Sequence, residues 1–152
     1  MAFTGKEARQ ELADAVGEAI HEIGFALASL GAAYEQLDEA TADRLEEALF
    51  APVQRALGRA KRAQAAFAEQ HDLESQLPEP RSAGPPSVRP KGHIESAVEA
   101  VDFADGALAG AQDSPAMTEF GGVELRAALS EIRELLGTVR PRARELVRTL
   151  GR

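Results

Sequence analysis

Few residues in this chain have the types and the spacing that catalysis or metal binding requires. Glu18 and His21 lie three positions apart, so on a helix their side chains would lie about one turn apart and could bind one metal ion. The other two histidines, His71 and His93, are distant from this pair in the sequence. The chain contains no cysteine, which excludes disulfide bonds, thiolate zinc sites and thiol nucleophiles.

Two partial resemblances to metal-binding families follow from the acidic residues. The Glu-x-x-His spacing at Glu18 resembles that of four-helix di-iron proteins, which carry it on two helices and add two further glutamates. Acidic pairs at helical spacing resemble the magnesium-binding carboxylates of all-helical nucleotide pyrophosphohydrolases, where several carboxylates converge from two helices. The pairs in this chain are Glu11 with Asp14 and Glu35 with Asp38. Because both sets are incomplete, we predict no catalytic, cofactor-binding or metal-binding residue.

The overall composition favours a helical protein. Hydrophobic residues make up 44% of the chain and charged residues 28%, but aromatic residues only 5%. Abundant alanine favours helices, whereas strands need the β-branched and aromatic residues that are sparse here. The net charge of -8 disfavours nucleic acid as a partner. No run of about 18 apolar residues and no signal-peptide pattern is present, so we expect a cytoplasmic protein without a membrane partner.

Four segments carry apolar residues at helical intervals, and these segments are the expected helices. Their approximate ranges are 5–36, 42–69, 93–109 and 123–150. Thr4 and Glu7 form a capping-box pattern at the start of the first segment. Pro52 predicts a bend or an interruption of the second helix near Phe50. Pro141, four residues after Gly137, predicts a kink in the last helix.

A proline-rich stretch near the middle of the chain separates the four helices into two pairs. It contains five of the eight prolines: Pro78, Pro80, Pro85, Pro86 and Pro90. We expect an all-α four-helix bundle built from two similar antiparallel helical hairpins, residues 1–70 and 93–152, joined by a linker at 71–92. An extended linker can span the length of a helix. The hairpins can therefore pair within one chain or exchange between two chains, and a homodimer or a domain swap is compatible with the sequence.

The two halves of the sequence resemble each other. An offset of 78 residues pairs Phe25 with Phe103 and Leu30 with Leu108. Two explanations stay open, the duplication of one hairpin and a shared helical periodicity in an alanine-rich chain.

Phe25 and Phe103 lie off the rows of residues that should form the core. Each follows two positions after a row residue, Ile23 or Val101, and so points roughly 200° around its helix from that residue. We therefore identify both phenylalanines as candidate anchors of an interface with a protein partner. The alternative is that they cover the edge of a wide core or lie beneath the linker.

Arginines are concentrated towards the ends of the second and fourth expected helices. The candidate binding residues among them are Arg59, Arg62, Arg140, Arg144 and Arg148. If both helices end at the same end of the bundle, these side chains form one basic patch. The alternative is that they pair with carboxylates of neighbouring helices and complement the helix dipoles.

These patterns favour a non-enzymatic helical interaction module, such as an adaptor, a regulator or an accessory subunit, that binds an unidentified protein partner. The first alternative is a helical bundle that binds an anion or a nucleic acid through its arginines. The second is a carboxylate-metal hydrolase.

Overall fold

The computed structural model describes residues 4–74 and 79–150, and within these residues all regular structure is helical. The helical elements are α1 (Gly5–Glu35), α2 (Glu39–Leu45), the π-helical turn η1 (Glu46–Phe50), α3 (Ala51–His71), α4 (Pro90–Asp113), the π-helical turn η2 (Met117–Gly121), α5 (Gly122–Gly137) and α6 (Val139–Leu150). Because α2, η1 and α3 form one rod, and η2, α5 and α6 another, four rods pack together. The expected all-α class with four packed helices is confirmed.

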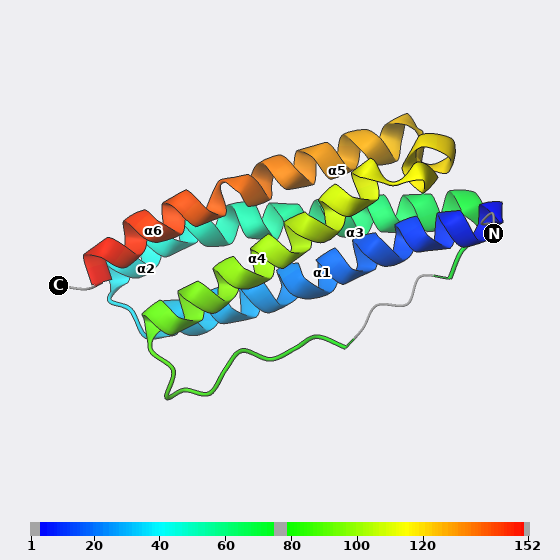
Figure 1. The fold of residues 1–152 in the computed structure, drawn as a ribbon. Coiled ribbons are helices and arrows are strands. Elements are labelled where there is room, and N and C mark those ends of the chain that lie inside the picture. Colours follow the sequence, from blue (N-terminus) through cyan, green and yellow to red (C-terminus); the bar gives the residue numbers. More distant parts are fainter. Residues whose placement is uncertain (1–3, 75–78, 151–152) are drawn as a thin grey trace.

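The four rods form a bundle in which each helix has two neighbours. Helix α1 packs against α3 and α4, and α5 packs against the same two helices. Helix α6 continues from α5 and contacts α4 and η1. Figure 1 shows that α1 and α5–α6 run in one direction along the bundle, while α3 and α4 run in the other. Helices α1 and α4 lie against each other over the greatest length of any pair.

Local capping interactions fix the starts of the first two helices. The Thr4 side chain accepts a hydrogen bond from the Glu7 amide at 3.1 Å, and the Glu7 carboxylate accepts one from the Thr4 amide at 3.4 Å, which confirms the capping box. At α2, the Thr41 amide donates to Asp38 Oδ1 at 2.8 Å. This hydrogen bond lowers the pKa of the Asp38 carboxyl below its ordinary value because it stabilises the ionised form.

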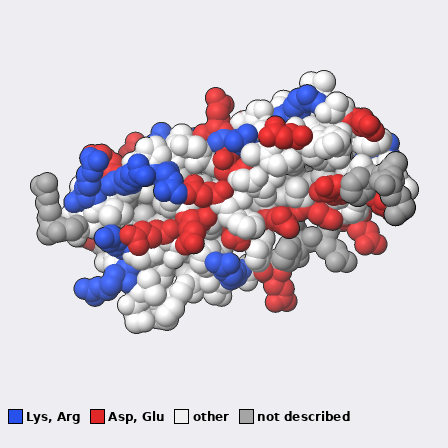
Figure 2. Space-filling view, in the orientation of Figure 1, with Lys and Arg blue, Asp and Glu red and all other residues white. Residues whose placement is uncertain are grey.

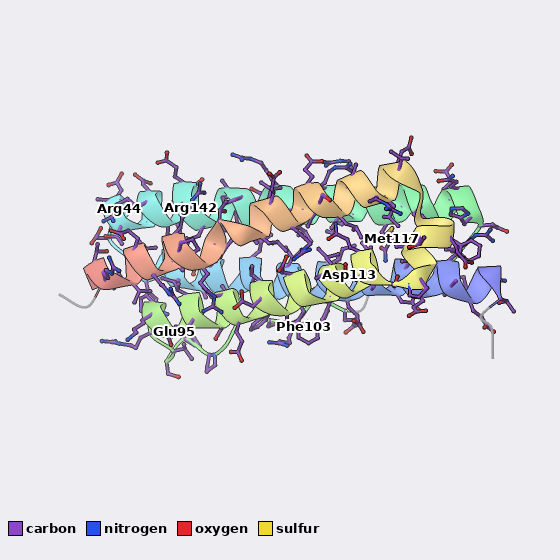
Figure 3. All side chains as sticks on the ribbon, turned by 45° about the horizontal axis from the view of Figure 1, so that its top comes forward. Arg44, Glu95, Phe103, Asp113, Met117 and Arg142 are labelled. Atoms are coloured by element: carbon purple, nitrogen blue, oxygen red, sulfur yellow. The ribbon has the colours of Figure 1, made fainter. Side chains whose placement is uncertain are left out.

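Pro52 interrupts the second rod where the sequence predicts it. The π-helical turn η1 lies directly before α3, in which Pro52 is the second residue. Since proline has no N–H group, it cannot donate to the carbonyl of Ala48 one turn earlier. Arg142 of α6 donates to this carbonyl from Nη1 at 3.2 Å and thereby links α6 to the second rod. Figure 3 labels Arg142 where α6 passes the rod that contains α2.

The last expected helix, 123–150, is divided in two. Helix α5 ends at Gly137, and Thr138 adopts a turn in which its hydroxyl donates to the Leu135 carbonyl at 2.8 Å. Pro141 lies in the first turn of α6. Because proline has no N–H group, it cannot donate a hydrogen bond to the Gly137 carbonyl. The kink that the sequence predicts is therefore a break between two helices.

The core of the bundle is mainly aliphatic and contains many alanines. Along α1 and α4, Ala26, Ala97 and Ala104 are wholly buried, and their small side chains let the two helices approach closely. The buried polar residue Gln64 donates from Nε2 to the Ala13 carbonyl at 3.0 Å and thereby links α3 to α1. Among the described residues, no helix is long and apolar enough to cross a membrane.

The described parts of the segment between α3 and α4 lie on the outside of the bundle, the first beside the end of α3 and the second leading to the start of α4 at the opposite end (Figure 1). Residues 72–74 and 79–89 contain no helix, whereas residues 75–78 of the expected linker lie outside the described part. Helix α4 begins at Pro90, earlier than the expected start at His93, because proline fits the first turn of a helix. The segment is attached to α1 at the Val88 carbonyl, which accepts a hydrogen bond from Gln36 Nε2 at 2.9 Å.

Candidate functional site

The structure separates the two groups of arginines that the sequence analysis considered together. Arg59 and Arg62 lie on α3 beside α5, whereas Arg140, Arg144 and Arg148 lie on α6 beside α4. Helices α3 and α6 end at opposite ends of the bundle (Figure 1). The single basic patch that would require both helices to end together therefore does not form.

The arginines of α6 border a groove between α4 and α6. Its volume is about 510 Å³, and its floor is apolar, formed by Ile94, Val98, Ala143 and Val147. One rim is acidic and comes from α4, with Glu95, Glu99 and Asp102. The other rim is basic and comes from α6, with Arg140, Arg144 and Arg148. The two rims thus carry opposite charges above an apolar floor, and we call this feature the α4–α6 groove.

One ion pair bridges the α4–α6 groove near the middle of the bundle. Arg140 pairs through Nη2 with Asp102 Oδ2, and both side chains are about half exposed. Figure 2 shows basic side chains over α6 next to a line of acidic side chains over α4. The arginines therefore face carboxylates of the neighbouring helix, which is the arrangement that the alternative interpretation of the arginines predicts.

The two phenylalanines have different surroundings. Phe25 is buried, and the Arg81 guanidinium from the α3–α4 segment lies over its ring at 3.6 Å from the centroid. Arg81 Nη1 also lies 3.9 Å from Glu22 Oε2. Phe103 is 59% exposed and projects outward from α4 (Figure 3). Phe25 thus lies beneath the segment between the halves, while Phe103 remains exposed.

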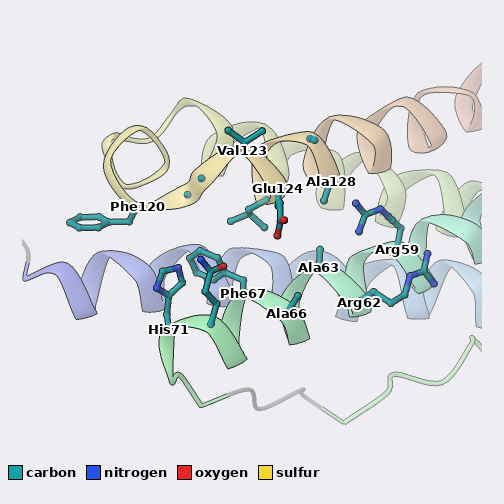
Figure 4. Close-up of a pocket in the computed structure, with 15 residues that line it drawn as sticks. Arg59, Arg62, Ala63, Ala66, Phe67, His71, Phe120, Val123, Glu124 and Ala128 are labelled. Carbon is teal, nitrogen blue, oxygen red and sulfur yellow. The ribbon is translucent and has the colours of Figure 1, made fainter.

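A second groove lies between α3 and α5, and we call it the α3–α5 groove. One hollow of about 600 Å³ extends from Arg59 to His71 on α3 and from Phe120 to Ala128 on η2 and α5. A second hollow of about 800 Å³ continues it from Arg62 back to Gln54. In Figure 4, His71 and Phe120 lie at one end of the first hollow and Arg59 and Arg62 at the other.

The rims of the α3–α5 groove also carry opposite charges. The α3 rim has Arg55, Arg59 and Arg62, and the α5 rim has Glu124, Glu131 and Glu134. Arg59 Nε donates to Glu131 Oε2 at 2.8 Å and crosses the groove. Arg59 and Arg62 were predicted from the sequence as candidate binding residues, but the three glutamates were not. Their spacing along one side of α5 was the available signal.

The potential metal ligands do not assemble in the described residues. No group of three or more histidine, aspartate or glutamate side chains there could hold a metal ion. His71 is the last residue of α3, and His93 lies in the first turn of α4 at the opposite end of the bundle (Figure 1). His21 and Glu18 share α1 but have no second pair of the same kind on a facing helix.

The fold changes the protonation of His71. Its ring lies 4.6 Å from the ring of Phe67, at an interplanar angle of 58°. Burial and, to a smaller degree, the positive charge of Arg9 lower the pKa of His71 below its ordinary value. The folded protein therefore favours neutral His71, whereas the unfolded chain binds a proton at the ordinary pKa.

This difference predicts a pH dependence of stability. Because the unfolded state binds more protons, His71 lowers the free energy of unfolding as the pH falls below about 6.5, and this loss is complete below the folded-state pKa. Denaturant unfolding at about pH 7.5 and about pH 5 measures it. We expect the His71→Gln variant to lose less stability than the wild type between these two values. Equal losses would contradict the prediction.

Comparison of the chain with protein-family models, with curated proteins and with solved structures finds no match in any of the three.

Proposed function

We propose that the protein is a non-enzymatic helical interaction module that binds an amphipathic helix of another protein in the α4–α6 groove. The observation that carries this proposal is the groove itself, with its apolar floor between an acidic and a basic rim. A helix fits such a site when its apolar side faces the floor and its flanks carry charges opposite to the two rims. An acidic flank would lie over α6, and a basic flank would lie over α4.

Phe103 extends the proposed binding surface along α4. Its exposed ring lies near Glu99, which also borders the α4–α6 groove. Large exposed aromatic side chains contribute strongly to binding when a partner buries them. Phe103, Arg144 and Arg148 are therefore the residues on which we expect partner binding to depend.

The aliphatic core supports an interaction role over an enzymatic one. An enzyme needs polar groups that converge in a cleft, and here the charged side chains lie along the rims of surface grooves. Binding of an anion or a nucleic acid is less well supported, because Arg59 and Arg140 are paired with carboxylates and the net charge is -8. A cytoplasmic location remains a prediction from the sequence.

We also propose that the bundle consists of two similar antiparallel hairpins of common origin, joined by the proline-rich segment. Equivalent positions at the offset of 78 residues support this origin, because they have equivalent burial. Ala26 and Ala104 are both wholly buried, and Leu30 and Leu108 are almost wholly buried. Phe25 and Phe103 differ because the α3–α4 segment covers only the first.

Capture of the partner from cells of the native source tests the proposed function. We expect the tagged protein to retain a protein at a fixed stoichiometry. The variants Phe103→Ser and Arg144→Glu/Arg148→Glu should each reduce its recovery about tenfold, since one displaces an aromatic anchor and the other reverses one rim. Arg44→Glu/Lys61→Glu is the matched control, because it changes the net charge equally at exposed residues away from the groove.

Circular dichroism of each variant would verify that the helical fold is retained. Three outcomes count against the proposal: no stoichiometric protein, a co-purifying metal, nucleotide or nucleic acid in its place, or a partner whose recovery the groove variants leave unchanged.

A further inference from the structure

The α3–α5 groove has a charge distribution that is complementary to itself. The basic rim on α3 and the acidic rim on α5 run antiparallel, and the ion pair between Arg59 and Glu131 sets their register. One helical turn from this pair, Arg55 on α3 lies level with Glu134 on α5. Arg55 and Arg59 therefore each have an acidic residue at nearly the same height on the other helix, while Arg62 and Glu124 both lie further along the groove on the other side of the Arg59–Glu131 pair.

This arrangement matches a particular two-fold symmetry. A two-fold axis parallel to the helices, placed above the groove, brings α3 of one copy over α5 of the other and preserves the height of every residue. Arg55 then faces Glu134 of the second copy, and Arg59 faces the second Glu131. A two-fold axis perpendicular to the helices would instead place α3 over α3 and oppose arginines to arginines. The charges thus favour one mode of association over the other.

We propose that a second copy of this chain covers the α3–α5 groove and forms a symmetric dimer through α3 and α5. The inference is independent of the α4–α6 groove, which lies on other helices and stays open in this dimer. It gives a role to Val123, which is 85% exposed on the rim of the groove. The neighbouring exposed residues Ala66 and Ala127 are small enough to let a second pair of helices approach closely.

The size of the surface indicates how strong the dimer is. Helix α5 has 16 residues, so the shared length of α3 and α5 is about 24 Å, and two adjacent helices are about 20 Å wide. A patch of this size covers on the order of 500 Å² on each copy, which is close to the lower limit for a specific interface. We therefore expect a reversible dimer whose population depends on the protein concentration.

Charge reversal on each rim tests the proposal. The acidic variant is Arg55→Glu/Arg62→Glu, and the basic variant is Glu124→Arg/Glu134→Arg. All four residues are exposed, so both variants should fold, which circular dichroism checks. Light scattering and sedimentation equilibrium from about 10 µM to about 1 mM would measure the mass relative to the 16.2 kDa chain. Arg44→Glu/Lys91→Glu is a matched control for the acidic variant.

The wild type and the control should form dimers. Each reversed variant alone should dissociate at least about tenfold more readily, because like charges then face each other in both halves of the interface. An equimolar mixture of the two variants should restore the dimer, since every acidic rim then faces a basic rim. This rescue distinguishes an interface effect from damage to the fold.

A wild type that stays monomeric over the whole concentration range would overturn the proposal. A dimer that both reversed variants form as well as the wild type would do the same, because it would show that another face or an exchange of hairpins holds the copies together. Capture of a partner through the α4–α6 groove would bear on the proposed function alone.

Discussion

The Ala104→Leu variant should lose about 1–3 kcal/mol of stability or more, because α1 and α4 have no room for a larger side chain at this position. Ala104 is wholly buried in α4, which lies along the length of α1. Leucine would force the two helices apart or push neighbouring side chains out of their preferred rotamers. Denaturant unfolding followed by circular dichroism measures the loss.

Gly106→Ala, two residues further along α4, is a control for which we expect a gain of stability in place of a loss. Gly106 is exposed, and a β-carbon there would meet no atom within 4 Å. We expect this variant to gain up to about 1 kcal/mol, because alanine favours a helix more than glycine does. An Ala104→Leu variant as stable as the wild type would show that the contact between α1 and α4 is looser than described.

The Gly122→Ala variant should lose about 1–3 kcal/mol because of its backbone conformation. Gly122 has φ 76° and ψ 168°, a region that side-chain-bearing residues almost never occupy. Asparagine tolerates the left-handed helical region but not this one, so Gly122→Asn should be no more stable than Gly122→Ala. Thermal and denaturant unfolding of both variants would check this order.

The preceding glycine, Gly121, is needed for a different reason. Its φ is -68°, which any residue can adopt, but a β-carbon there would overlap the sulfur of the buried Met117. Gly121→Ala should therefore be destabilised by overpacking, and the additional substitution Met117→Ala should relieve part of that effect. If the losses of stability of the two single variants simply add in the double variant, this explanation for Gly121 is wrong. The prediction for Gly122, which rests on its backbone conformation, would not be affected.

Local sequence patterns predicted the helices well because their signals act over a few residues. The capping box at Thr4 and Glu7, the interruption before Pro52 and the kink before Pro141 all depend on neighbours within one turn. The boundaries of α4 were less accurate, since the proline at its first position was assigned to the linker. The division of the last rod at Thr138 is clear only from the structure.

The candidate site was harder to predict because it depends on which helices are neighbours. The arginines were identified from their concentration, but their partners Asp102 and Glu131 lie on other rods. Periodicity identifies the buried side of a helix and not the helix that it faces. For the same reason, one interface role was expected for both Phe25 and Phe103, although the α3–α4 segment covers only Phe25.

The segment that crosses the outside of the bundle also influences how the chain folds. It connects α3 to α4 and so forms part of the long stretch of chain between α1 and α4, whose contacts join residues far apart in the sequence. The entropy of closing a loop grows slowly with its length, by about 0.6 kcal/mol for each doubling, whereas distant contacts slow the search for the native fold. The length of this segment therefore affects how quickly the two halves meet more than how firmly they stay together.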